Sequence, residues 1–157
     1  MQKNNEYFMK LALKEAKKAY LIGETPIGCV IVKDDKVIAR GYNRREKDKL
    51  SLAHAEVIAI KKASKVIGDW RLEGCKLYVT LEPCIMCAGA IIQSRIEEVY
   101  YGAKDYRFGA DVSYAHIFDL NFNHKVQIEG GILESECSEL ISSFFKELRS
   151  KNKLENK

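Results

Sequence analysis

Residues 76–87, with the sequence KLYVTLEPCIMC, lead from a predicted strand directly into a predicted helix. The mostly apolar run Lys76–Leu81 is typical of a buried strand, and Pro83 fits the first position of a helix. Cys84 and Cys87 are three residues apart, so a helix presents both on one face. The stretch therefore places two thiols at the end of a sheet strand, a common place for chemistry in α/β proteins.

The segment His54-Ala55-Glu56 supplies the further groups that a metal site with these cysteines needs. Imidazole and thiolates suit zinc, and three protein ligands, here His54, Cys84 and Cys87, leave the fourth position of a tetrahedral site for water. Zinc lowers the pKa of such a water from about 15.7 to about 7, and a nearby carboxylate such as Glu56 can take its proton. The pattern favours a catalytic zinc site and a hydrolytic reaction.

The spacing between His54 and Glu56 restricts where their helix begins. Residues two apart point in different directions on a regular helix, so both cannot reach one metal site from the middle of a helix. We expect His54 at the very start of its helix, where the backbone is still turning, and the helix to end before Gly68.

Two other uses of the cysteine pair are open. The pair can belong to a structural zinc site, which needs a fourth protein ligand. The candidates for that ligand are Cys29, Cys75, Cys137, His116 and His124, none of which repeats a short ligand spacing. The pair can also be a redox motif, because the thiols of C-x-x-C at a helix start have lowered pKa values. A redox pair would leave His54 and Glu56 unexplained.

Hydrophobic periodicity predicts the other elements. Helices are expected over residues 8–19 and from Ser135 onward, strands over 27–32, 37–42, 97–101 and 126–129, and a short helix over 111–120. The apolar content of the first two strands is typical of central, buried strands. A helix between the last two strands permits a crossover, so we expect these strands to be parallel. The final helix carries an apolar stripe of Cys137, Leu140, Ile141, Phe144 and Leu148.

Charge is a weak indicator for this chain. The 157 residues carry a net charge of +4, from 26 basic and 22 acidic residues, which does not by itself indicate nucleic-acid binding. Basic residues gather at Arg44–Lys49 and at the end of the last predicted helix, about 146–157. Each group either contacts phosphates or is simply a solvated loop or helix end.

Cysteine content and hydropathy indicate the compartment. Five cysteines, an odd number, argue against a disulfide framework and for a reducing environment. Cys29, Cys75 and Cys137 are expected to be small core residues. The polar N-terminus and the lack of a long apolar run predict no signal peptide and no membrane span. We therefore expect a cytoplasmic protein.

The H-A-E and P-C-x-x-C segments together resemble the signature of zinc-dependent nucleobase and nucleoside deaminases. Within that superfamily the chain is most similar to bacterial tRNA-specific adenosine deaminases, which convert the wobble adenosine to inosine. The similarity runs nearly end to end, through Glu24–Gly28, Gly41–Arg44, Ala53–Glu56, Trp70–Gly74, Leu77–Cys84, Cys87–Ile91, Ser94–Ile96, Tyr101–Ala103, Asn123–His124, Gly131–Leu133 and Phe144–Phe145.

The resemblance implies a fold and a reaction. The fold is an α/β structure of the cytidine deaminase type, with three α/β/α layers and a five-stranded mixed sheet, as one deaminase domain over residues 1–157. One Zn²⁺ per subunit would be held by His54, Cys84 and Cys87, with Glu56 as the proton shuttle. The substrate would be the anticodon stem-loop of tRNA, and the partner a second copy in a homodimer.

The resemblance also implies substrate-binding residues, namely Pro26, Asn43, Ala55, Asp105 and Phe145. Asn43 matches the asparagine that holds the target nucleotide, and Asp105 matches an acid in a loop near the RNA. Each has a simpler explanation, because an asparagine after a strand is commonly a turn residue and an aspartate in such a loop is commonly solvated. Phe145 lies beside the apolar stripe, as core edge or as a stacking surface for RNA.

The chain departs from the family pattern between Lys104 and Leu120, where it has Asp105-Tyr106-Arg107-Phe108-Gly109 in place of Asp-Pro-Lys. In the family this loop flanks the RNA. Tyr106 and Phe108 either stack on bases or pack against a partner subunit. Two other functions therefore stay open: a deaminase of free nucleobases or nucleosides such as cytosine, guanine or cytidine, and a non-catalytic, zinc-stabilised RNA-binding module.

Overall fold

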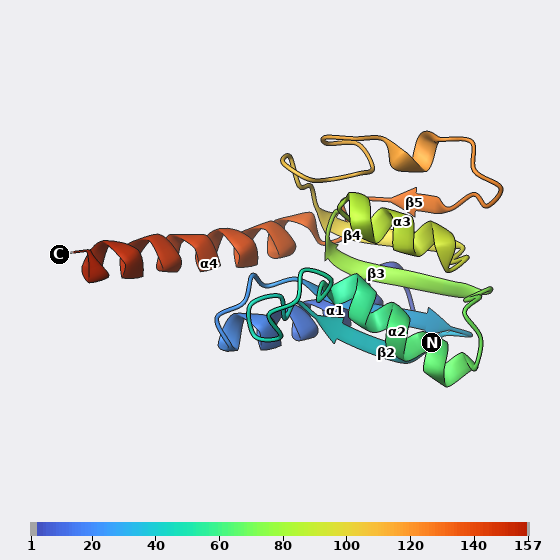
Figure 1. Cartoon of the computed structure of the whole chain (residues 1–157), viewed down its shortest axis with the longest axis horizontal. Coiled ribbons are helices and arrows are strands. Elements are labelled where there is room, and N and C mark those ends of the chain that lie inside the picture. The colour runs from blue at the N-terminus through green and yellow to red at the C-terminus, as the bar shows by residue number, and fades with distance from the viewer. Residues whose placement is uncertain (1–2, 157) are drawn as a thin grey trace.

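The computed structural model describes residues 3–156, which form one mixed sheet of five strands in the order β2-β1-β3-β4-β5 (Figure 1). The elements in chain order are α1 (Asn5–Leu21), β1 (Gly28–Lys33), β2 (Lys36–Tyr42), α2 (Ala55–Ile67), β3 (Cys75–Leu81), α3 (Ile85–Gln93), β4 (Glu98–Ala103), a 3₁₀ turn (Ile117–Asp119), β5 (Gln127–Glu129) and α4 (Glu134–Glu155).

Helices cover both faces of the sheet because alternate residues of its strands point to opposite sides. One cluster joins α1 and α4 to the sheet, and it consists of Phe8, Met9, Ala12, Leu13, Val30, Val32, Tyr78, Ala103 and Cys137. The cluster on the other face joins α2 and α3 to the sheet and includes Cys29, Ile31, Ala55, Ala59, Cys75, Leu77, Val79, Ala88 and Ile91. The three-layer fold and the core positions of Cys29, Cys75 and Cys137 are confirmed.

Strand directions bring several loops to one edge of the sheet. β1 is antiparallel to both β2 and β3, whereas β3 and β4 are parallel. As a result, the carboxyl ends of β2, β3 and β4 lie at the same edge, next to the start of β1. Ligand sites of open α/β sheets commonly lie at such an edge. The segments that follow Tyr42, Leu81 and Ala103 therefore meet here.

Gly41 lets α2 approach the sheet closely. A Cβ at this position would lie 2.5 Å from the carbonyl oxygen of Ala55 and 2.9 Å from the backbone nitrogen of Ala59. The first turn of α2 therefore rests directly on β2, and this contact sets the point at which His54 enters the helix.

The expected hairpin of β1 and β2 is confirmed, but β2 is not a central strand. It lies at the edge of the sheet and, in the described chain, pairs with β1 alone. Ala39 and Gly41 are buried, whereas Lys36 and Arg40 are exposed. The apolar content of this segment thus reflects packing against α2 and not burial on both sides.

The parallel pairing of β4 and β5 is confirmed, whereas the expected helix over 111–120 is wrong apart from the turn Ile117–Asp119. The backbone N–H groups of Asp111, Val112 and Ser113 donate to the carboxylate of Glu82. The N–H groups of Tyr114 and Ala115 both donate to the carbonyl oxygen of Gly109, so the i→i−4 bonds of an α-helix do not form here.

Helix α4 continues beyond the body of the molecule (Figure 1). Cys137 and Phe144 of the predicted stripe are buried, but Leu148 is 39% exposed. The stripe therefore packs only along the first part of the helix, because no other element reaches its later turns. Within residues 3–156, no helix combines the length and the apolar character needed to cross a membrane.

Candidate active site

His54 and Cys84 occupy equivalent places at the start of two helices. Each is the N-cap residue of its helix, His54 of α2 and Cys84 of α3, with extended backbone angles and no side-chain capping bond. Both side chains are therefore free to turn toward the sheet edge. The expected helix start at His54 is confirmed. The prediction that Pro83 occupies the first helical position is wrong, because α3 begins two residues later, at Ile85.

The ligand atoms of the metal centre, His54, Cys84 and Cys87, lie within 4.8 Å of one another. His54 Nδ1 is 3.6 Å from Cys84 Sγ and 3.5 Å from Cys87 Sγ. Tetrahedral zinc, with Zn–S near 2.3 Å and Zn–N near 2.1 Å, requires nitrogen–sulfur separations of about 3.6 Å. The three side chains fit a zinc ion.

Protonation of these side chains is consistent with a metal site. Hydrogen bonding with Cys87 and then with His54 lowers the pKa of Cys84 to about 4, although burial opposes the shift. The contact with Cys84, together with burial, raises the pKa of Cys87. The hydrogen bond with Cys84 also raises the pKa of His54, against the effect of burial. The side chains of His54, Cys84 and Cys87 thus share protons, and a divalent cation bound by them would displace these protons.

Glu56 is a buried acid beside the metal centre. It lies in the first turn of α2, is 4% exposed and lines the same cavity as His54 and Cys84. Burial, together with the negative charge of Cys84, raises the pKa of Glu56 to about 7. A carboxyl group with such a pKa can both accept and donate a proton near neutral pH, which is what a general acid–base catalyst requires.

A cavity of about 550 Å³ opens over the metal centre, within the range of pockets that hold small organic ligands. Its walls come from the segment before β1, the loops after β2, β3 and β4, and α4. The lining residues are Thr25, Ile27, Asn43, Arg45, His54, Ala55, Glu56, Leu81, Glu82, Cys84, Lys104, Asp105, Tyr106, Arg107, Phe108, Ile141 and Phe145.

Four of the five residues expected to bind substrate line this cavity, namely Asn43, Ala55, Asp105 and Phe145. Pro26 does not, although its neighbours on both sides do. Phe145 is 39% exposed and also packs edge-on against Phe144, so it lies at the border between core and cavity. The roles of these residues in binding stay predictions.

Asn43 and Asp105 also hold their own loops in shape. Asn43 Nδ2 donates to the carbonyl oxygen of Thr25 at 3.3 Å, and its Oδ1 accepts the N–H of Arg45 at 3.3 Å. Asp105 Oδ1 accepts the N–H groups of the second and third residues after it at 3.1 and 3.2 Å. The turn function considered for Asn43 is therefore present, and Asp105 is more than a solvated side chain.

Glu82 lines the cavity too, although the sequence motifs assigned it no role. It is 2% exposed. Burial alone would raise its pKa, but hydrogen bonds from Ser113, Val112 and Asp105 outweigh burial and lower the pKa of Glu82. A charged residue between an apolar strand and Pro83 was the available signal, because carboxylates are rarely buried unless they are paired.

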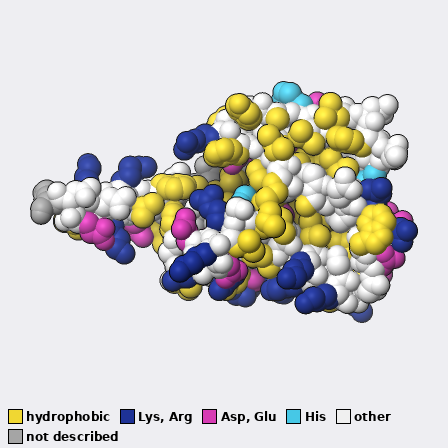
Figure 2. Space-filling model, in the orientation of Figure 1, with side chains coloured by type: hydrophobic (Ala, Val, Ile, Leu, Met, Phe, Trp, Pro, Cys, Tyr) yellow, Lys and Arg dark blue, Asp and Glu magenta, His cyan; other side chains and the backbone are white. Residues whose placement is uncertain are grey.

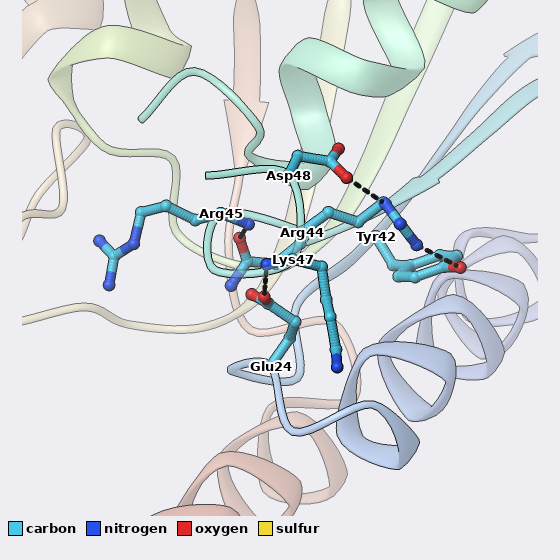
Figure 3. Close-up of polar contacts among 7 residues, drawn as sticks. Glu24, Tyr42, Arg44, Arg45, Lys47 and Asp48 are labelled. Carbon is cyan, nitrogen blue, oxygen red and sulfur yellow. Dashed lines mark hydrogen bonds and ion pairs between the residues drawn. The ribbon is translucent and has the colours of Figure 1, made fainter. Parts of the chain in front are cut away.

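The loop of residues 43–54, between β2 and α2, also contacts a buried acid (Figure 3). Glu24 is 1% exposed, and its Oε1 accepts the N–H of Lys47 at 2.8 Å. Glu24 Oε2 finds no hydrogen-bond donor within the described residues. Figure 3 shows Arg44 directed toward Asp48 and Tyr42, whereas the side chain of Arg45 extends away from these contacts. Of these basic residues, Arg45 is the one that lines the cavity.

A closed zinc site is not seen within residues 3–156. The metal centre is the one group of three or more potential ligands found there. His116 Nδ1 lies 3.0 Å from the carbonyl oxygen of Asp111, and His124 Nε2 lies 2.7 Å from that of Ile96. The three remaining cysteines are buried in the core. A zinc ion held by His54, Cys84 and Cys87 would thus keep one position for water, and two of these ligands, His54 and Cys84, line the cavity.

Comparison with known proteins agrees with this geometry. Residues 2–103 match the model of the cytidine and deoxycytidylate deaminase zinc-binding region. The chain belongs to this family of zinc-dependent deaminases.

Relatives within the family differ in their similarity to this chain. The tRNA-specific adenosine deaminase of Bacillus subtilis (strain 168) is 49% identical over 154 residues, which cover 98% of this chain and 96% of the relative. A solved structure from work on A-to-I editing by tRNA:A34 deaminases is 45% identical, with a TM-score of 0.83, and the match covers 85% of this chain and 98% of the other. The guanine deaminase structure from Bacillus subtilis is 34% identical, with a TM-score of 0.64 and coverage of 94% and 95%.

Proposed function

We propose that this protein hydrolyses the amino group of the wobble adenosine of a tRNA, giving inosine and ammonia. The observation that carries the proposal is a buried carboxyl group beside a three-ligand metal centre, at the base of a cavity that polar and aromatic side chains surround. The relative at 49% identity and the solved structure at 45% are both tRNA adenosine deaminases, whereas the guanine deaminase is 34% identical.

The chemistry divides between the metal and Glu56. A zinc ion held by His54, Cys84 and Cys87 would supply Lewis acidity that makes water a nucleophile near neutral pH. The Glu56 carboxylate takes a proton from the attacking water and delivers it to the ring nitrogen beside the reacting carbon. Glu56 then takes the second proton of the same water, whose oxygen is now bonded to the reacting carbon. It gives this proton to the amino group, which leaves as ammonia. Water and adenosine thus become inosine and ammonia.

The cavity walls would hold the flipped base and the nucleotides beside it. Asn43 and Ala55 line the same cavity as the metal centre and would contact the target nucleotide, with the turn at Pro26 supporting this wall. Phe145 and Asp105 lie on the outer walls. Cationic side chains from two loops, Arg45 and Lys104 among them, would contact the phosphates.

We further propose that two copies of the chain associate. Large apolar side chains stand exposed near α3 and before β5, namely Ile85, Val112, Tyr114, Leu120 and Phe122. Figure 2 shows hydrophobic side chains gathered over this part of the molecule. Patches of this kind commonly mark protein interfaces. Sedimentation equilibrium should give about twice the mass of one chain, and a single-chain mass at micromolar concentration would contradict the proposal.

For the location of the protein we propose the cytoplasm. All five cysteines are free, which suits a reducing compartment.

Activity on RNA tests the proposed function. Zinc-loaded protein is incubated with a transcribed tRNA that has adenosine at the wobble position, and inosine is detected by sequencing. The matched control is the same tRNA with guanosine at the wobble position and adenosine one nucleotide away. We expect inosine at the wobble position of the first RNA and no inosine in the control. Turnover of free guanine or cytosine without turnover of the tRNA would establish the alternative deaminase function instead.

A further inference from the structure

The loop that follows β4 is organised around one buried carboxylate. Oε1 of Glu82 accepts the N–H of Asp105 at 3.1 Å and the hydroxyl of Ser113. Oε2 accepts the N–H groups of Asp111, Val112 and Ser113 at 3.0, 3.0 and 3.1 Å. Five donors from the two ends of the loop thus converge on a single side chain.

None of the ion pairs within residues 3–156 includes Glu82. The five hydrogen-bond donors are therefore the groups that stabilise the negative charge of its carboxylate. The loop also wraps tightly around the carboxyl group at Gly109. A Cβ at this position would lie 2.4 Å from Glu82 Cδ and 2.5 Å from the carbonyl oxygen of Asp105. The path of the loop is therefore determined by Glu82 and by the lack of a side chain at residue 109.

The first half of this loop, residues 104–108, forms part of the cavity wall. Lys104, Tyr106, Arg107 and Phe108 all line the cavity, and all are exposed. Two cations and two aromatic rings beyond the metal centre suit the phosphates and bases that flank a target nucleotide. A free nucleoside has no such neighbours and gains nothing from these side chains.

We propose that Glu82 is a positioning residue that gives the site its preference for polynucleotides over free nucleosides, by holding the loop of residues 104–113 at the mouth of the cavity. The inference rests on the proposed function, because it concerns the RNA that this function requires. Glu82 acts through the loop and does not contact the reacting atoms.

The variant Glu82→Gln tests the proposal. Glutamine keeps one acceptor oxygen, but it replaces the other with an NH₂ group. The NH₂ group cannot accept hydrogen bonds from the N–H groups of residues 111–113, so this end of the loop loses its attachment. We expect KM for an anticodon stem-loop to rise roughly tenfold, as for the loss of a hydrogen bond to a charged group, with kcat and zinc content nearly unchanged. Trypsin should cleave the variant after Lys104 and Arg107 several-fold faster than it cleaves the wild type, because the more mobile loop can enter the active site of a protease.

The matched control is Glu15→Gln. Glu15 is also buried, at 3% exposed, but it does not line the cavity, and it forms an ion pair with Lys18 at 2.8 Å. This control removes a buried carboxylate without touching the loop, so KM and the cleavage rates in the loop should match the wild type. A milder variant, Ser113→Ala, removes one donor and should raise KM about twofold even where Glu82→Gln fails to fold.

Several outcomes would overturn the role of Glu82. These are an unchanged KM and unchanged cleavage in Glu82→Gln, a loss confined to kcat or to zinc content, or, if Glu82→Gln does not fold, no effect of Ser113→Ala. Wild-type protein without activity on any RNA would instead remove the proposed function. The cleavage rates after Lys104 and Arg107 would then still show whether Glu82 positions the loop.

Discussion

The metal centre and the mouth of the cavity are close in space but are built in different ways. The ligands of the metal centre lie at the starts of two helices, α2 and α3, which the sheet holds in place. The mouth consists of two loops, residues 43–54 and 104–113, each of which is tied to one buried glutamate. Under the proposed function, the chemistry would depend on regular structure, and recognition on side chains that shape irregular backbone.

This difference has a practical consequence for mutation. Helix starts are stabilised by core packing over many residues, so a single change in a ligand leaves the backbone in place. The two loops have fewer such contacts: besides the glutamates, Asn43 and Asp105 bond to backbone groups within or next to them. Changes at the metal centre should therefore abolish the reaction in a folded protein, and changes at the mouth should alter the binding of the substrate.

The largest expected effect is at Glu56. Glu56→Ala removes the proton carrier, and general acid–base catalysis contributes about 10²–10⁴-fold to rates, so kcat should fall by about that factor. Zinc content should stay at the wild-type level because Glu56 is not among the ligands. Single-turnover kinetics on the tRNA and elemental analysis measure the two quantities. Substantial remaining turnover would contradict the shuttle role.

The next effect concerns the ligands themselves. Cys87→Ser replaces a thiolate with a hydroxyl group, which is a poor ligand for zinc at neutral pH, so metal content and activity should fall together. Cys75→Ser is the matched control, since Cys75 is buried in the core and lies outside the metal centre. Full zinc occupancy in Cys87→Ser, measured by elemental analysis, would remove Cys87 from the ligand set.

A smaller effect is expected at the outer wall. Phe145→Ala removes a ring that lines the cavity, and stacking of a base on an aromatic side chain is worth about 1–3 kcal/mol. KM for the stem-loop should rise while kcat stays close to the wild-type value. Phe144→Ala serves as the contrast, because Phe144 is buried and should lower the melting temperature more than it changes KM. Equal KM values for Phe145→Ala and the wild type would assign Phe145 to the core edge.

The smallest effect is expected at Glu24, and it distinguishes how Glu24 and Glu82 hold their loops. Glu24 uses only Oε1, toward the N–H of Lys47, so the amide oxygen of Glu24→Gln can replace it. We expect KM within about twofold of the wild type, whereas Glu24→Ala leaves the N–H unpaired at a cost of about 1–3 kcal/mol. A large rise in KM for Glu24→Gln would show that the charge of Glu24, and not its acceptor oxygen, holds the loop.

The metal centre was predictable from the sequence because its residues lie next to elements with clear periodicity. Cys84 follows an apolar strand, and the spacing of His54 and Glu56 required a helix start, which the structure shows. The start of α3 was predicted two residues too early, at Pro83, because the turn between β3 and α3 has no periodicity of its own.

The mouth was less predictable because long-range contacts shape it. A helix was expected over 111–120, but the N–H groups of Tyr114 and Ala115 donate to the carbonyl oxygen of Gly109 and not in the i→i−4 pattern. The segment instead folds around Glu82, which is about thirty positions earlier in the chain. Likewise, the edge position of β2 depends on which strand pairs with β1 and not on the apolar content of β2. Local sequence patterns carry no information about partners at that separation.

Helix α4 supplies one wall of the cavity, through Ile141 and Phe145, whereas all three metal ligands precede it in the chain. A ribosome therefore completes the metal ligands well before it adds this wall.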